Sequence, residues 1–200
     1  MHLIDRNTRT THSEPPALTT YSPGQPWPAE LNGIPFSRWQ DHPDPYGWDE
    51  AGLNCAGLIE PPLQAPAGAR VTAAAVVLEP DHRIWALAKA ANHSSTTARF
   101  PAGSQDSSLS LQGVAVREAW ERTGLKVRII GWLGDFDDSP LLHTRYYLAE
   151  RIGGAPASNP WAEDTVLLAT LDALTQPAPF GLSLGDRRCL VALRNVLAIS

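Results

Sequence analysis

Three charged side chains near the middle of the chain, those of Glu118, Glu121 and Arg122, have the spacing of one helix face. Positions i, i+3 and i+4 are neighbours on a helix surface, so we expect these side chains to lie together. Carboxylate oxygens are the hard ligands that Mg2+ prefers, and a bound divalent cation neutralises charge on phosphate groups. A simpler interpretation stays open, in which Arg117 and Glu121 form only an i, i+4 salt bridge.

A longer pattern contains these residues and spans residues 103–125. Its fixed positions are Gly103, the pair Arg117-Glu118, Glu121, and the closing pair Gly124-Leu125. The pattern resembles the Nudix box, G-x5-E-x7-R-E-U-x-E-E-x-G-U, where U is a bulky aliphatic residue, and its spacing is complete. The resemblance implies a Nudix hydrolase, in which glutamates of the box helix hold divalent cations against a diphosphate. It therefore implies that Glu118 and Glu121 bind Mg2+ or Mn2+ and that, with Arg117, they form the catalytic set.

Two positions of the box differ from the family pattern. The glutamate expected after G-x5 is Leu109, and the second glutamate of the E-E pair is Arg122. Leucine cannot coordinate a cation, and an arginine places positive charge where the family binds dications. At about 4 Å and an effective dielectric constant near 20, each unit-charge pair is worth roughly 4 kcal/mol. We therefore expect a reduced metal affinity, and Arg122 is a candidate for binding a substrate phosphate directly, as guanidinium groups do.

Further metal ligands are expected outside the box helix. Asp106 lies in the box loop, and Asp164 follows Glu163 just before a short strand, where Nudix enzymes often place a late acidic ligand or base. Asp106 and Asp164 are therefore candidate metal ligands, with solvated loop acids as the simpler interpretation. Residues 135–138 contain three more aspartates and are expected to form a polar loop near the substrate side.

Three residues besides Arg122 are candidates for contacting the substrate. Gly103 opens the box loop, Arg145 lies in a strand-like segment from which it reaches a phosphate, and Trp161 stacks on a base. The simpler interpretations are a surface position for Arg145 and a packing role for Trp161.

The elements that must position these residues follow from the periodicity of apolar side chains. Residues 71–78 and 84–88 indicate a hairpin, and residues 111–123 indicate a helix with Ser110 as N-cap and Gly124 at its C-terminal end. Residues 127–133, 144–149 and 165–169 indicate strands, and residues 184–197 an amphipathic closing helix. This order predicts the α/β fold class, as a Nudix-type α/β/α sandwich with a mixed central sheet.

The composition bounds the domain organisation and the partners. The chain has 200 residues and a net charge of −5, which predicts a globular domain that binds neither nucleic acid nor a membrane surface. We expect a flexible tail over residues 1–30, an aromatic and proline-rich extension over residues 31–68 packed on the main domain, and a Nudix domain over residues 69–200. With no apolar signal-peptide core near Met1, the predicted location is cytoplasmic.

Three hypotheses about function are carried forward. The first is a weakened, metal-dependent Nudix hydrolase of a nucleoside diphosphate linked to another moiety, with an ADP-ribose-like compound or a sugar nucleotide as substrate. The second is a catalytically inactive Nudix domain that binds a nucleotide or a protein partner. The third is a scaffold whose aromatic N-terminal segment forms a homodimer or docks a partner.

Overall fold

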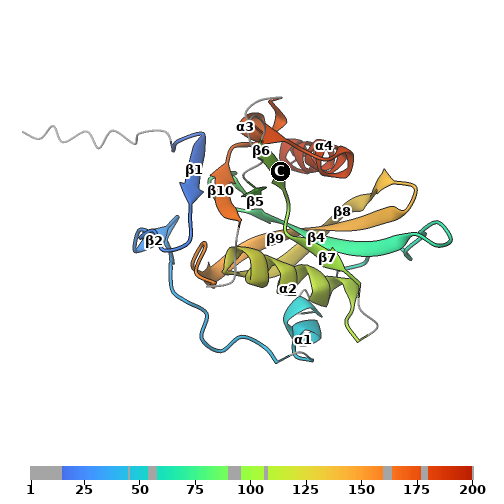
Figure 1. The fold of residues 1–200 in the computed structure, drawn as a ribbon, viewed down its shortest axis with the longest axis horizontal. Coiled ribbons are helices and arrows are strands. Elements are labelled where there is room, and N and C mark those ends of the chain that lie inside the picture. Colours follow the sequence, from blue (N-terminus) through green and yellow to red (C-terminus); the bar gives the residue numbers. More distant parts are fainter. Residues whose placement is uncertain are drawn as a thin grey trace, which may run out of the picture.

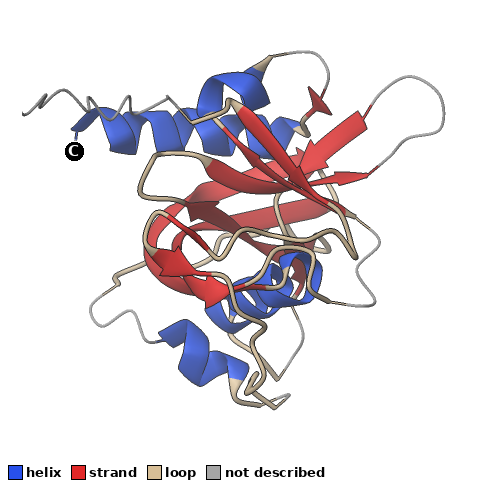
Figure 2. Ribbon diagram, turned by 90° about the vertical axis from the view of Figure 1, so that its left-hand side faces the viewer, coloured by secondary structure: helices blue, strands red, loops and turns tan. Residues whose placement is uncertain are grey.

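The structure, a computed structural model, describes residues 15–44, 46–53, 58–89, 96–105, 108–159, 164–176 and 180–199. A central sheet lies between two layers of helices (Figures 1 and 2). Within the described residues, none of the helices is long and apolar enough to cross a membrane.

The central sheet combines parallel and antiparallel strands. Its main path follows the order β1 (Leu18–Tyr21), β10 (Thr165–Ala169), β5 (Ile84–Lys89), β4 (Arg70–Leu78), β9 (Leu142–Gly154) and β8 (Leu125–Ser139). Strands β4 and β9 pair in parallel, whereas the other neighbours on this path are antiparallel. The short strands β6 (Thr96–Arg99), β7 (Ala102–Ser104) and β11 (Phe180–Gly181) join at its margins. The predicted mixed central sheet is therefore confirmed.

Strand β4 is buried on both faces because helices cover both sides of the sheet. Its side chains alternate between two hydrophobic clusters: Ala73, Ala75 and Val77 face one, while Ala74 and Val76 face the other. Helices α1 (Trp48–Leu53) and α2 (Leu111–Thr123) lie on the first side, and α3 (Leu171–Thr175) and α4 (Leu184–Ile199) on the second (Figure 2). This arrangement is the expected α/β/α sandwich.

Helix α2 has the predicted bounds because both of its end signals are local. The Ser110 side chain accepts a hydrogen bond from the Gly113 amide and caps the first turn. Gly124 takes a left-handed conformation, with φ of 80°, and its amide donates to the Trp120 carbonyl. A side chain at position 124 would also collide with the Ala155 carbonyl and the Ser158 hydroxyl.

The β8–β9 hairpin is longer than the sequence predicts. Residues 135–138 were expected to form a loop, and that prediction is wrong, because they continue β8, and residues 135–137 pair with residues 143–145 of β9. Cross-strand contacts hold these polar residues in the ladder: Asp135 binds Arg145, and Asp137 lies 2.6 Å from the His143 ring nitrogen Nδ1.

Residues 18–35 are part of the same folded body. Strand β1 pairs with β10, so the expected flexible tail over residues 1–30 is wrong for residues 18–21. The two-stranded ribbon of β2 (Glu30–Leu31) and β3 (Ile34–Pro35) is tied to the main domain by Arg151, which donates to the Leu31 and Ile34 carbonyls. Arg151 is fully buried and pairs with Glu79 at 2.5 Å.

Candidate functional site

A cavity of about 390 Å³ lies beside the second half of the Nudix-like helix α2. Its walls come from the beginnings of β4 and β9, from β6 and β7, and from the start of α4. Arg70, Arg99 and Arg122 line it, so we call it the arginine cavity. Asp138 and Asp186 line it as well. The arrangement gathers three cations around a space large enough for a small ligand.

Glu118 contacts two residues that line this cavity, Gly103 and Arg122, and it is held by two arginines. Its Oε2 accepts a hydrogen bond from Arg122 Nε at 2.8 Å, and its Oε1 lies 3.4 Å from a terminal guanidinium nitrogen of Arg117. The carboxyl is buried, whereas Arg122 is 38% exposed and reaches the cavity. Gly103 packs against the same carboxyl, because a Cβ at that position would overlap the Glu118 side chain. Gly103, Arg117 and Glu118 therefore lie together in the structure.

Glu121 occupies a different environment on the same helix. It is half-buried, and burial raises the pKa of its carboxyl, with a smaller rise from the charge of Glu118. The nearby guanidinium groups of Arg117 and Arg122 act in the opposite direction. Glu121 does not line the arginine cavity in this arrangement.

The N-terminal extension explains the leucine in the box. Leu109 is 5% exposed and belongs to the hydrophobic cluster that contains Trp48 of α1. Directly beside it, Asp49 of α1 accepts a hydrogen bond from the Ser110 amide at 2.7 Å. Because α1 covers the start of α2, a glutamate at position 109 would be an unpaired buried charge, and leucine is the residue that fits.

Arg145 does not reach the cavity. Thr144 and Tyr146 line it, and the alternation of side chains along β9 turns Arg145 to the opposite face of the sheet. There its guanidinium binds Asp135 at 2.7 Å and Glu60 at 2.8 Å, and the bond to Asp135 raises its pKa. In this structure Arg145 therefore fastens residues 60–61 to the hairpin, and its contact with a substrate stays a prediction.

Of the remaining candidates, only Asp164 lies within the described residues. Its Oδ2 is 2.6 Å from a guanidinium nitrogen of Arg99, so this acid is neutralised by an arginine of the cavity. Asp106, Trp161 and Glu163 lie outside the described residues.

The sequence analysis missed two buried titratable groups in the cavity, Asp186 and Tyr146. The Tyr146 hydroxyl donates to Asp186 Oδ1 at 3.1 Å, and Ser183 supports the same carboxylate. Burial raises the pKa of Asp186 to about 6. An acid on the buried face of an amphipathic helix was the available signal, since Asp186 and Leu190 both face the interior.

These residues do not fit a divalent cation as they are arranged. Both oxygens of Glu118 face guanidinium groups, and Asp164 is already paired with Arg99. Among the described residues, no three histidine, cysteine, aspartate or glutamate side chains gather as metal ligands. Guanidinium groups therefore stand around Glu118 where further acids would be needed to bind a metal ion.

The comparisons with known proteins agree with this scaffold. The family model of the NUDIX domain matches residues 68–189, so the chain belongs to the NUDIX domain family. No curated protein matches it in sequence.

The chain is also similar to solved structures, at low sequence identity. A UDP-X diphosphatase is 17% identical, with 68% of each chain covered and a TM-score of 0.50. An ADP-ribose pyrophosphatase from Streptococcus suis is 21% identical over 62% of this chain and 92% of that one, with a TM-score of 0.47. A NUDIX hydrolase from Nitrosomonas europaea is 15% identical over 64% and 90%, with a TM-score of 0.48.

Proposed function

We propose that this Nudix domain binds a nucleoside diphosphate linked to a second moiety, such as an ADP-ribose-like compound or a sugar nucleotide, and hydrolyses it slowly. The observation that carries the proposal is the convergence of Arg70, Arg99 and Arg122 on one cavity. Guanidinium groups bind phosphate oxygens through paired N–H donors, so the three arginines can supply hydrogen-bond donors to a diphosphate. Catalysis is expected to be slow because Glu118 is held by two arginines and Arg122 replaces an acid of the box.

The hydrolytic step uses Asp186 as the general base. Its pKa of about 6 leaves the carboxylate ionised at pH 7 yet basic enough to take a proton. A water molecule attacks one phosphorus, its proton passes to Asp186, and the bond from that phosphorus to the bridging oxygen breaks. The products are two phosphate monoesters. Arg122 and Arg99 stabilise the charge that develops on the phosphate oxygens.

A second candidate function is binding without turnover. The Arg122–Glu118 pair favours it, because arginine stands where the box has a glutamate and because Glu118 serves as the counter-ion of that arginine. In this case the same cavity holds the diphosphate, and Asp186 does not act on it.

The two candidates are separated by measuring affinity and turnover with ADP-ribose and UDP-glucose in EDTA. Binding is expected for the wild type and for Asp186→Asn, whereas turnover is expected only for the wild type. Arg122→Gln should weaken binding by roughly 10- to 100-fold, the range of a hydrogen bond to a charged group. Arg194→Gln and Asp172→Asn are matched controls, because this pair is exposed and lies on α4 and α3. Binding without turnover selects the second candidate, and no binding of either compound contradicts both.

A further inference from the structure

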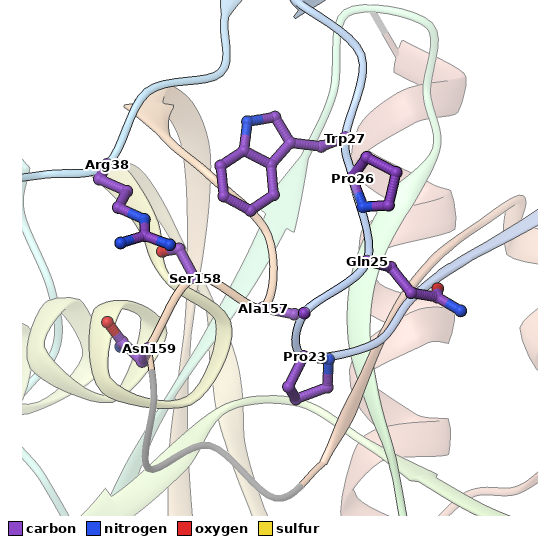
Figure 3. Close-up of a pocket in the computed structure, with 9 residues that line it drawn as sticks. Pro23, Gln25, Pro26, Trp27, Arg38, Ala157, Ser158 and Asn159 are labelled. Atoms are coloured by element: carbon purple, nitrogen blue, oxygen red, sulfur yellow. The ribbon is translucent and has the colours of Figure 1, made fainter.

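A second pocket, of about 590 Å³, lies where the N-terminal segment meets the loop after β9. We call it the N-terminal pocket. One side is formed by residues 23–27, and the other by Arg38 together with residues 157–159 (Figure 3). Neither the Nudix box nor the arginine cavity contributes a residue to it. Its volume is in the range of small-molecule sites.

The apolar part of the pocket is flat. The indole of Trp27 extends into the space between the two sides, Pro26 lies next to it, and Pro23 lines the far end of the pocket (Figure 3). Trp27 is half-buried and packs against the main hydrophobic cluster, so the ring is held in place and still lines the pocket. A fixed indole next to a proline suits a planar ring, because aromatic rings and bases stack on such faces.

The polar part of the pocket offers a cation and a rigid acceptor. Arg38 is exposed, and no ion pair to it is formed by an acid of the described residues. Arg38 and Ser158 both line the pocket (Figure 3). Asn159 is 6% exposed, and its Nδ2 donates to the Trp120 and Glu121 carbonyls at 2.5 and 2.9 Å. The amide nitrogen is therefore occupied, and Oδ1 is the atom left to accept from a ligand.

From this geometry we infer that the N-terminal pocket is a second ligand site, for a nucleoside monophosphate. The base stacks on Trp27, and the phosphate binds Arg38 and the Ser158 hydroxyl. Asn159 Oδ1 accepts a hydrogen bond from the base or the ribose. The site is tied to the first one, because Asn159 holds the last turn of α2, where Glu121 and Arg122 lie. A ligand in the N-terminal pocket would therefore contact a residue that is hydrogen-bonded to helix α2, which lines the arginine cavity.

Isothermal titration with AMP tests the inference on the full chain. We expect saturable binding that is weakened at least tenfold by Trp27→Ala and by Arg38→Glu. Trp27→Phe, which keeps a ring, should retain most of the affinity and shows that the loss in Trp27→Ala is not a folding defect. Adenosine and inorganic phosphate are the ligand controls, and each should bind at least tenfold more weakly than AMP. Trp132→Ala and Arg128→Glu are matched controls on β8, outside the pocket.

Several outcomes overturn the inference. Absence of AMP binding would do so, and so would unchanged affinity in Arg38→Glu. If Arg122→Gln abolishes AMP binding while the Trp27 and Arg38 variants do not, AMP occupies the arginine cavity instead. ADP-ribose affinity measured on Trp27→Ala keeps the two proposals separate, because the proposed function requires that affinity to persist.

Discussion

The replacement Arg122→Glu tests whether arginine has displaced metal binding from this Nudix box. In the wild type, Arg122 Nε lies 2.8 Å from Glu118 Oε2, and Glu118 is 8% exposed while Arg122 is 38% exposed. An exposed pair contributes less than about 1 kcal/mol, but leaving a buried carboxylate with a poorer partner costs about 1–3 kcal/mol. Discounting for the exposure of Arg122, we expect Arg122→Glu to lower the free energy of unfolding by about 1–2 kcal/mol in EDTA.

The same replacement restores an acid beside Glu118 and Glu121, so it should create a dependence on Mg2+. Ligand that binds only the folded state stabilises it by about 2.7 kcal/mol at 100 times its Kd. Urea unfolding of the wild type, Arg122→Glu and the control Arg128→Glu, each in EDTA and in Mg2+, measures both effects. We expect Mg2+ to stabilise only Arg122→Glu. A wild type that Mg2+ stabilises equally, or an Arg122→Glu variant as stable as the wild type in EDTA, would refute the reasoning.

Three further predictions follow from buried groups. Burial raises the pKa of Asp186 from 3.8 to about 6, so the stability that this group contributes is complete below pH 4 and is lost as pH rises through 6. In urea unfolding from pH 4 to 7, the free energy of unfolding of the wild type should fall by up to about 3 kcal/mol relative to that of Asp186→Asn. Parallel pH curves for the two proteins would contradict the assignment. Leu109→Glu should lower the free energy of unfolding by at least about 3 kcal/mol, whereas Leu109→Met should lower it by less than about 1.5 kcal/mol. A stable glutamate variant would show that α1 does not exclude water from this position. Arg145→Gln should destabilise the fold by about 3 kcal/mol while leaving ADP-ribose affinity unchanged, and a selective loss of affinity would place Arg145 in the cavity after all.

Local signals were sufficient to predict the parts of the fold that depend on neighbouring residues. Helix α2 begins after Ser110 and ends before Gly124, as the capping pattern indicates, and β10 has the predicted bounds. The box spacing also brought Gly103 to Glu118, because both positions belong to one continuous pattern.

The features that could not be predicted from the sequence depend on contacts between residues that are distant in the chain. Asp135 and Asp137 have the composition of a turn, but their partners Arg145 and His143 on the next strand keep them in β8. The alternation along β9 separates Arg145 from Thr144, yet only the packing of α4 determines which face carries the cavity. Similarly, the leucine at position 109 departs from the box pattern because α1, a segment distant in sequence, covers it.

The buried Arg151–Glu79 pair has a consequence for how this chain can be divided. The family match begins at residue 68, but two carbonyls that satisfy Arg151 belong to Leu31 and Ile34, far upstream. Without those residues, a fully buried guanidinium would face open space and lose acceptors, a cost that a marginally stable domain does not tolerate well. The matched region and the unit that folds are therefore not the same, and exchange of Nudix domains between chains would have to carry the preceding segment with it.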